Sequence, residues 1–283
     1  MKIASFQYDG ALSYGLVDKN LLFPVSLAFQ SYYPTLRDVL HANKLAEFQS
    51  DVTSSNRPLK LADVILLPPI PDPGKIICVG INYKKIYPLD VTPPVMDYPI
   101  LFGKERETLL GHNQDLHIPA GLAANSFDYE GEIAVVIGKS GRAIPEGSAF
   151  DHVAGYTVLN DGSVREWQKH SIHAGKNFAG SGACGPWMLT ADEIDAPENM
   201  ELTTRLNGVI VQQTMASEMI FSIPQQIAYI SNILPLSAGD IIATGSPEGT
   251  GGSRKPPRFL KKDDVLDITV SNIGTLTNRV NDS

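Results

Sequence analysis

Two glutamates lie two residues apart in the segment FDYEGEIAVVIG (Phe127–Gly138), whose apolar run is typical of a buried β-strand. Side chains at positions i and i+2 of a strand point to the same face, so Glu130 and Glu132 are expected side by side. Asp161 ends the apolar run of a second segment, GYTVLNDGSVREWQ (Gly155–Gln168). Three carboxylates that share one site repel one another unless a cation neutralises them. All-oxygen ligands favour Mg²⁺ or Mn²⁺, with Ca²⁺ as a further hard cation, over zinc.

The spacing alone leaves a second interpretation open. Two acids at i and i+2 of a strand are also typical of a solvated face, and an aspartate before glycine, as in Asp161-Gly162, is typical of a turn. The histidines show no H-E-x-x-H spacing and the two cysteines form no ligand motif, so a zinc site is not indicated.

Short apolar runs of strand type must position these residues. Only two helices are indicated. An apolar stripe at helical spacing predicts one over 35–47, and a capping box at Ser222 and Gln225 predicts the start of another. Asn207-Gly208 predicts a type I′ hairpin turn. The fold class is therefore mainly β with some α. Strands are expected at 2–8, 12–17, 76–79, 100–102, 132–137, 155–159, 202–206, 209–212, 240–244, 265–270 and 275–280.

The segment LLPPIPDPGK (Leu66–Lys75) holds four prolines, which neither a helix nor a central strand can accommodate. We place a domain boundary there. Residues 1–70 are expected to form a small N-terminal α+β domain, and residues 71–283 a larger domain that carries the chemistry.

Composition excludes several function classes. A formal charge of −8 and a pI near 5.2 argue against a nucleic-acid partner. The sequence contains neither a signal-peptide pattern nor an apolar run long enough for a membrane span, and two distant cysteines make no disulfide framework. These features favour a cytoplasmic location without membrane partners.

The larger part of the chain, roughly 73–280, resembles the fumarylacetoacetate hydrolase superfamily, which includes acylpyruvate hydrolases and 2-hydroxyhepta-2,4-diene-1,7-dioate isomerases. The resemblance implies a rolled, mixed β-sheet fold and a homodimer. It also implies a divalent metal held by Glu130, Glu132 and Asp161. The blocks that carry it are KIICVGINY (75–83), DYEGEIAVVIGK (128–139), GYTVLNDGSVREWQ (155–168), GKNFAGSGACGPW (175–187), LNGVIVQ (206–212), LSAGDIIATGSPEG (236–249) and IGTLTNRV (273–280).

Members of this superfamily act on 2-oxo acids, acylpyruvates or their enols by C–C bond hydrolysis, hydration, isomerisation or decarboxylation. The resemblance implies catalytic roles for Lys176, Arg165 and Gln168. A 2-oxo carboxylate can chelate a metal through a carboxylate oxygen and its keto oxygen, and the metal then stabilises an enolate. Lys176 and Arg165 would offset the negative carboxylates, although Arg165 could instead have a structural role.

Further residues are candidates for contact with the substrate. Tyr83 ends the GINY block, and the loop ATGSPEGTGG offers hydroxyls of Thr244 or Ser246 to a substrate oxygen. Glu248 on the same loop could act as an acid or base, or be solvated. Cys184 is expected to be a packed small residue rather than a nucleophile.

The chain departs from the family pattern after Tyr83. Where hydrolytic members commonly carry a histidine and a glutamate that activate water, this sequence has Ile86 and Leu89. Hydrolysis needs a positioned base that removes a proton from water, and such a base commonly contributes about 10²–10⁴-fold in rate. The loss of both residues therefore makes isomerisation, tautomerisation or decarboxylation more strongly expected than before. C–C bond hydrolysis keeps first place by a narrow margin, and a non-catalytic metabolite-binding protein is a further alternative. The substitute bases considered are Tyr87, Asp90, His112, His170 and His173.

Overall fold

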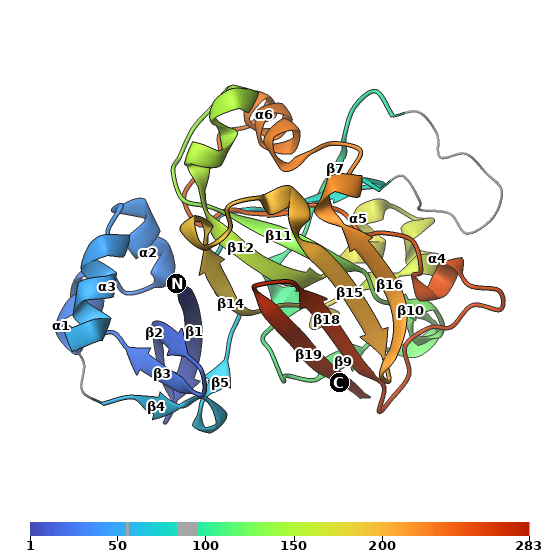
Figure 1. The fold of residues 1–283 in the computed structure, drawn as a ribbon. Helices are drawn as coiled ribbons and strands as arrows, with labels where there is room; N and C mark the ends of the chain where they lie inside the picture. Colours follow the sequence, from blue (N-terminus) through green and yellow to red (C-terminus); the bar gives the residue numbers. More distant parts are fainter. Residues whose placement is uncertain (55–56, 84–95, 283) are drawn as a thin grey trace.

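The computed structural model describes residues 1–54, 57–83 and 96–282. Two β-sheets dominate these residues, with short helices around them (Figure 1). The larger sheet has the strand order β4-β3-β2-β1-β14-β12-β11-β17-β6-β7. Its strands are β4 (Leu59–Lys60), β3 (Leu21–Pro24), β2 (Ala11–Asp18), β1 (Lys2–Tyr8), β14 (Gly182–Thr190), β12 (Val153–Asn160), β11 (Gly131–Ile137), β17 (Ile241–Ala243), β6 (Ile76–Gly80) and β7 (Ile100–Gly103), with β5 (Ile65–Leu66) beside β1 and β8 (Leu109–Leu110) beside β14.

The second sheet faces the middle of the first. Its order is β16 (Val209–Met215), β15 (Glu201–Leu206), β18 (Val265–Val270), β19 (Gly274–Asp282) and β9 (Leu116–Ile118). A separate pair joins β10 (Phe127–Asp128) to β13 (Ser163–Val164). The prediction of a mainly β fold with some α is confirmed.

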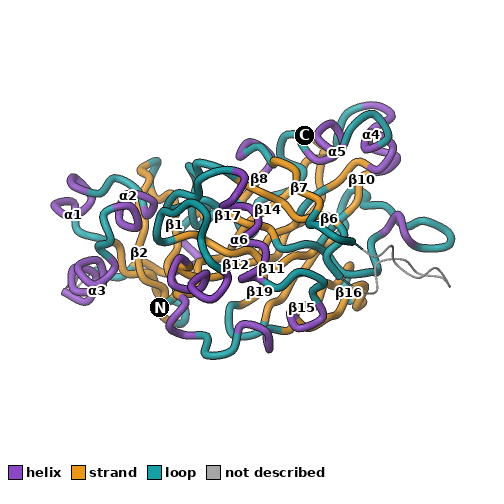
Figure 2. The backbone as a smooth tube through the Cα atoms, turned by 90° about the horizontal axis from the view of Figure 1, so that it is seen from above, coloured by secondary structure: helices purple, strands orange, loops and turns teal. Residues whose placement is uncertain are grey.

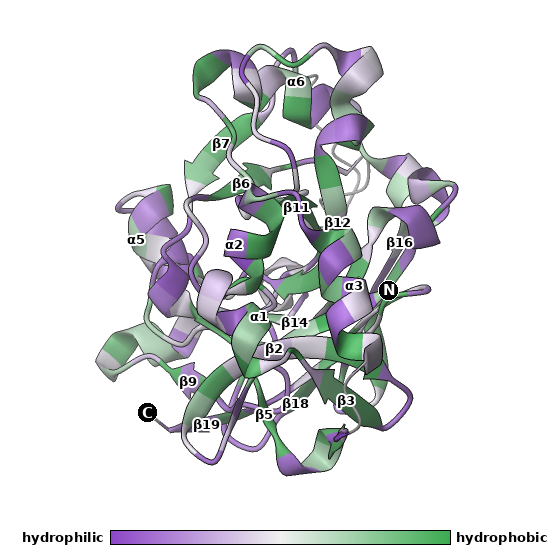
Figure 3. Cartoon of the chain, turned by 90° about the vertical axis from the view of Figure 1, so that its left-hand side faces the viewer, coloured by the Kyte–Doolittle hydropathy of each residue, from purple (hydrophilic) through white to green (hydrophobic). Residues whose placement is uncertain are grey.

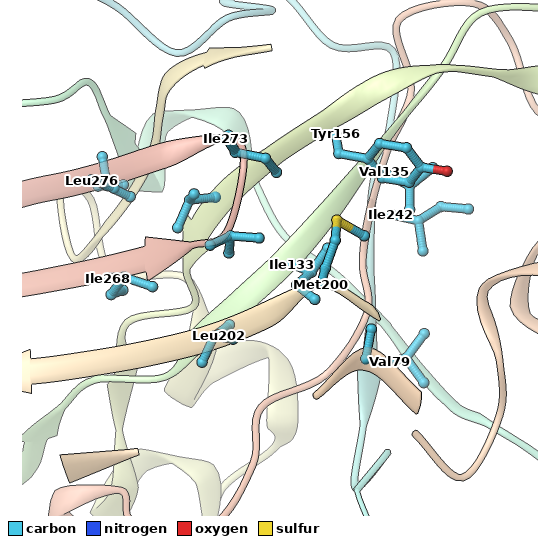
Figure 4. Packing of buried hydrophobic residues seen from close by; sticks show 14 of the residues in the cluster. Val79, Ile133, Val135, Tyr156, Met200, Leu202, Ile242, Ile268, Ile273 and Leu276 are labelled. Atoms are coloured by element: carbon cyan, nitrogen blue, oxygen red, sulfur yellow. The ribbon is translucent and has the colours of Figure 1, made fainter. Parts of the chain in front are cut away.

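The main hydrophobic core lies between the two sheets (Figure 4). One side is built from strands of the larger sheet, which are largely hydrophobic along their length (Figure 3), and the other from the second sheet. Burial of this apolar surface stabilises the arrangement that holds β11 and β12 in place. The side chains labelled in Figure 4 are Val79, Ile133, Val135, Tyr156, Met200, Leu202, Ile242, Ile268, Ile273 and Leu276, all buried.

The helices are short: α1–α3 lie at one end of the molecule and α4 and α5 at the other (Figure 2), and α6 lies above the sheets (Figure 1). The N-terminal ones are α1 (Leu27–Tyr32), α2 (Leu36–His41) and α3 (Leu45–Ser54). The others are α4 (Arg165–Gln168), α5 (Ile172–Lys176) and α6 (Ile223–Ile233). None of the described helices is long and apolar enough to cross a membrane.

Several predicted elements form as expected, one does not, and one central strand was not predicted. Ser222 and Gln225 make the capping box of α6, and both residues of the Asn207-Gly208 turn have positive φ, as a type I′ turn requires. The single helix expected at 35–47 is wrong, because Asn43 adopts a left-handed conformation (φ 55°) and separates α2 from α3. The sequence analysis also missed β14, a central strand.

The N-terminal strands continue the larger sheet, because β1 pairs with β14 at Lys2↔Leu189 and Ile3↔Met188. In Figure 1 these strands and α1–α3 lie to one side of the two-sheet body. The division into residues 1–70 and 71–283 stays a prediction.

Candidate metal and substrate site

The three predicted metal ligands meet at one end of the β11–β12 pair. Antiparallel register places Gly131 opposite Asn160 and Glu132 opposite Leu159, so the start of β11 lies beside the end of β12. Backbone bonds lock this junction: the Asp161 N–H donates to the Glu130 carbonyl (2.8 Å). One ligand oxygen from each of Glu130, Glu132 and Asp161 lies within 4.8 Å of the others.

The glycine between the two glutamates has a packing reason. A Cβ at Gly131 would lie 2.2 Å from the Thr204 hydroxyl of the facing sheet. The E-G-E spacing therefore lets the second sheet approach closely while both glutamates point away from it and line the same cavity. The predicted continuous strand from 127 to 138 is interrupted here, because β10 ends at Asp128 and β11 starts at Gly131.

Two lysines neutralise part of this acidic cluster. Lys176, the last residue of α5, donates to Glu130 Oε2 (2.5 Å) and Asp161 Oδ2 (2.6 Å). Lys104 forms an ion pair with Asp161 Oδ1 at 2.8 Å. Burial alone would raise the pKa of Asp161, but these two lysines outweigh it and lower the pKa below its ordinary value. Asp161 therefore stays ionised beside the two lysines.

Glu132 has the opposite electrostatic environment. Its side chain is buried, and its Oε2 accepts from the Gly245 N–H at 2.8 Å. Burial first, and then the neighbouring Asp161 and Glu130 carboxylates, raise its pKa well above the ordinary value. Glu132 is thus short of positive charge, which is the condition in which a carboxylate gains most from a nearby cation.

Arg165, at the start of α4, is held by two acids. Its Nε donates to Asp128 Oδ2 (2.7 Å) and its Nη1 to Glu130 Oε1 (2.6 Å). Buried Asp128 also accepts from the N–H groups of Gly251 (2.7 Å) and Gly252 (2.8 Å). Asp128 therefore links Arg165 to the loop after β17.

Glu130, Glu132, Arg165 and Lys176 line one cavity of about 550 Å³. Its apolar wall comes from β6, β7 and α5, and the opposite wall from the loop after β17. Side chains of Ile100, Phe102 and Ile172 form the first, and those of Ser246, Thr250 and Ser253 contribute to the second. A larger cavity of about 690 Å³ beside β6, β7 and α6 includes none of the three carboxylates in its described lining.

The donor chemistry of the cluster fits a divalent cation. With all four carboxyl groups ionised, the site has four negative charges (Asp128, Glu130, Glu132 and Asp161) and three positive ones (Lys104, Arg165 and Lys176), which leaves one negative charge for a cation to neutralise. Mg²⁺ and Mn²⁺ prefer such carboxylate oxygens, and the triad would leave positions for a chelating ligand.

Of the other predicted site residues, some line the cavity and some do not. Gln168 and Ser246 line the cavity, and Ser246 Oγ accepts from Gln212 (2.9 Å). The Thr244 hydroxyl donates to the Ile133 carbonyl (2.8 Å) and lies outside the cavity lining, as do Tyr83 and Glu248. Tyr83 is buried close to Glu132, and burial first, then that carboxylate, raise its pKa.

The proposed substitute bases that are described do not reach the cavity. His112 accepts from the Thr277 N–H (3.0 Å), His170 packs on Trp167, and His173 contacts Asn177. Ile86, Leu89, Tyr87 and Asp90 lie outside the described residues. Cys184 is fully buried, which raises its pKa to about 12 and disfavours a nucleophilic thiolate.

Sequence reasoning missed Lys104 and Asp128. Lys104 sits in LFGKERE, where an isolated lysine after a strand carries no chemical signal. Asp128 stands two residues before Glu130, and its same-face spacing with the two glutamates could have identified it.

The fold and this site define a sheet-built protein with an acidic, lysine-bridged cavity suited to a hard cation and an oxygen-rich anion. The family described as fumarylacetoacetate (FAA) hydrolase C-terminal matches residues 75–281, and the chain belongs to this family. The resemblance inferred from the sequence is confirmed.

Individual relatives extend the comparison. The chain is 40% identical over 248 residues to the oxaloacetate tautomerase YisK of Bacillus subtilis, covering 86% of this chain and 82% of the relative. It is 38% identical over 236 residues to the mitochondrial oxaloacetate tautomerase fahd2 of Xenopus laevis, covering 82% and 73%. The solved fumarylacetoacetate hydrolase (EaFAH) from psychrophilic Exiguobacterium antarcticum has a TM-score of 0.86 at 31% identity, with 100% of both chains covered. This likeness confirms the predicted family fold.

Proposed function

We propose that the chain is a divalent-metal-dependent enzyme that interconverts the keto and enol forms of a 2-oxo dicarboxylic acid such as oxaloacetate. The observation that carries the proposal is the convergence of Glu130, Glu132 and Asp161 within 4.8 Å beside the ammonium of Lys176. The substrate is suggested by the two relatives that are named oxaloacetate tautomerases.

Glu130, Glu132 and Asp161 are the residues that would hold Mg²⁺ or Mn²⁺. Such a cation, when bound, supplies Lewis acidity that stabilises negative charge on a keto oxygen. Lys176 keeps its proton, because Asp161 and Glu130 raise its pKa against the effect of burial, so it presents a fixed positive charge to a developing enolate. Arg165 lines the cavity, and its guanidinium, which also pairs with Asp128 and Glu130, would add positive charge beside a substrate carboxylate.

C–C bond hydrolysis of an acylpyruvate, placed first by the sequence analysis, becomes the second candidate. The name of the solved relative from Exiguobacterium antarcticum supports it. Hydrolysis needs a base aimed at water, whereas the described cavity lining includes no histidine and the sequence has Ile86 and Leu89 at the expected base positions. Tautomerisation needs no attacking water, which is why we place it first.

The test follows the ultraviolet absorbance of enol-oxaloacetate with purified protein, with and without Mg²⁺ or Mn²⁺. Metal-dependent acceleration of its decay to the keto form, abolished by a chelator, supports tautomerisation. Unchanged decay together with two acids released from an acylpyruvate would establish hydrolysis instead, and release of CO₂ would establish decarboxylation. Binding of oxalate without turnover of any substrate would favour a metabolite-binding protein.

Three further properties stay predictions. A homodimer and a cytoplasmic location are expected from the resemblance and the composition, and Mg²⁺ or Mn²⁺ from the ligand types. Size-exclusion chromatography with light scattering tests the first, and metal titration tests the last.

A further inference from the structure

Lys104 is a fully buried lysine on the side of Asp161 opposite Lys176. It directly follows β7, and its backbone N–H donates to the Ile76 carbonyl (3.0 Å), which ties it to the neighbouring strand. Its side chain has 0% exposure. Its Nζ lies 2.7 Å from the Lys176 carbonyl, 2.8 Å from Asp161 Oδ1 and 3.5 Å from the Gly162 carbonyl.

A buried ammonium is costly unless several oxygens replace its water shell. Here the oxygens come from two segments, the turn after β12 and the end of α5, which Lys104 therefore joins. The Lys176 carbonyl belongs to the last turn of α5, where unpaired carbonyls attract a cation.

The two oxygens of Asp161 are held by different ammonium groups. Lys176 contacts Oδ2 at 2.6 Å and Lys104 contacts Oδ1 at 2.8 Å. Rotation of the carboxylate would break both contacts, so the pair fixes its plane. The stem of Lys104 also lies in a narrow space, because a Cβ at Gly182 would approach Lys104 Cε to 3.2 Å.

We propose that Lys104 is a positioning residue of the metal site, which fixes the Asp161 carboxylate and the α5 end that carries Lys176. This role rests on the proposed metal-binding function. Charge alone works in the opposite direction, since removal of a cation beside three carboxylates would strengthen binding of a dication. If removal of Lys104 weakens metal binding, the cause is therefore the lost positioning of Asp161 and α5 rather than the lost charge.

The experiment measures Mn²⁺ affinity of the purified protein by electron paramagnetic resonance, independently of turnover. The variant is Lys104→Met, which keeps the unbranched stem, one heavy atom shorter, and removes the charged ammonium group. The matched control is Lys75→Met, because Lys75, directly before β6, pairs with the buried Asp240 at 2.7 Å rather than with any of the three carboxylates.

Lys104→Met is expected to bind Mn²⁺ about 10–100-fold more weakly than wild type, the range for lost support of a metal ligand. Lys75→Met is expected to bind like wild type although it also loses an ion pair to a buried acid. Lys104→Arg, which keeps the charge, is expected to regain part of the affinity and replaces the methionine variant if that protein does not fold. Affinity in the Lys104 variants equal to or tighter than wild type overturns the proposal, whereas absence of Mn²⁺ binding by wild type overturns the metal site itself.

Discussion

At the residue scale, the site is an acidic cluster whose members experience opposite electrostatic environments. Asp161 is balanced by two ammonium groups, whereas Glu132 has a backbone N–H as its hydrogen-bond partner and a raised pKa. Removing a charge at these two positions should therefore have different consequences for the metal-free protein.

Glu132→Gln is expected to weaken Mn²⁺ binding by at least about 10-fold, since it removes a ligand charge. The metal-free variant should be as stable as wild type or more so, because repulsion from Asp161 and Glu130 is relieved. Thermal unfolding with and without Mn²⁺ measures both effects. Equal metal-induced shifts in variant and wild type would contradict a role for Glu132 as a ligand.

Lys176→Met is expected to lower kcat/KM for enol-oxaloacetate by about 10²–10³-fold, the effect of losing one preorganised donor to an oxyanion. Its Mn²⁺ affinity should fall less than that of Lys104→Met, because removing the Lys176 charge beside Glu130 and Asp161 favours a dication and offsets part of the lost contact with Asp161 Oδ2. Steady-state kinetics and metal titration separate the two. A fall in metal affinity with unchanged kcat would assign Lys176 to structure rather than to catalysis.

At the element scale, the site depends on how segments distant in the sequence are tied together. Sequence patterns predicted β11, β12 and their carboxylates, because apolar runs and acidic spacing are local signals. They did not predict β14, whose GACGPWMLT contains glycine and proline, nor Lys104 and Asp128, whose partners lie on other segments. The roles of Lys104 and Asp128 become visible only when the folded sheet brings their partners next to them.

The loop after β17 also depends on close contacts with distant segments, and this leads to a prediction. A Cβ at Gly251 would lie 2.1 Å from the Arg258 carbonyl and 2.6 Å from Asp128 Oδ1. Gly251→Ala should therefore displace the loop, lower stability by about 1–3 kcal/mol as overpacking does, and raise KM. Gly147→Ala is the control, since nothing lies within 4 Å of its Cβ position. Unfolding curves and KM measure the difference, and equal behaviour of both variants would show that the loop tolerates the change.

At the scale of the whole molecule, a buried carboxylate ties together segments that lie far apart in the sequence at one end of the second sheet. Buried Asp264 accepts from Arg258 Nη2 (2.7 Å), the Lys261 N–H (2.8 Å) and Asn207 Nδ2 (2.8 Å). It therefore anchors the β15–β16 turn and the segment before β18 to each other. Burial would raise its pKa, but these donors outweigh burial and lower it.

The lowered pKa of Asp264 predicts how stability depends on pH. Its contribution is present above the unfolded pKa of about 4 and is lost as pH falls through the lower folded value. Asp264→Asn should be less stable than wild type by about 1–3 kcal/mol at pH 7, because it loses charged hydrogen bonds. Urea unfolding from pH 7 downwards should show the two proteins converging in acid. A constant difference across this range would exclude the ionised carboxylate as its source.

The pairing of β1 with β14 also affects the order in which the strands can pair during synthesis. β1 (Lys2–Tyr8) needs β14 (Gly182–Thr190), which is translated much later, as its partner, and contacts between such distant segments form slowly. Until then, part of one edge of β1 exposes unpaired backbone groups, which other nascent chains could engage. Efficient production of this protein should therefore depend on chaperones that shield the N-terminal strands during synthesis.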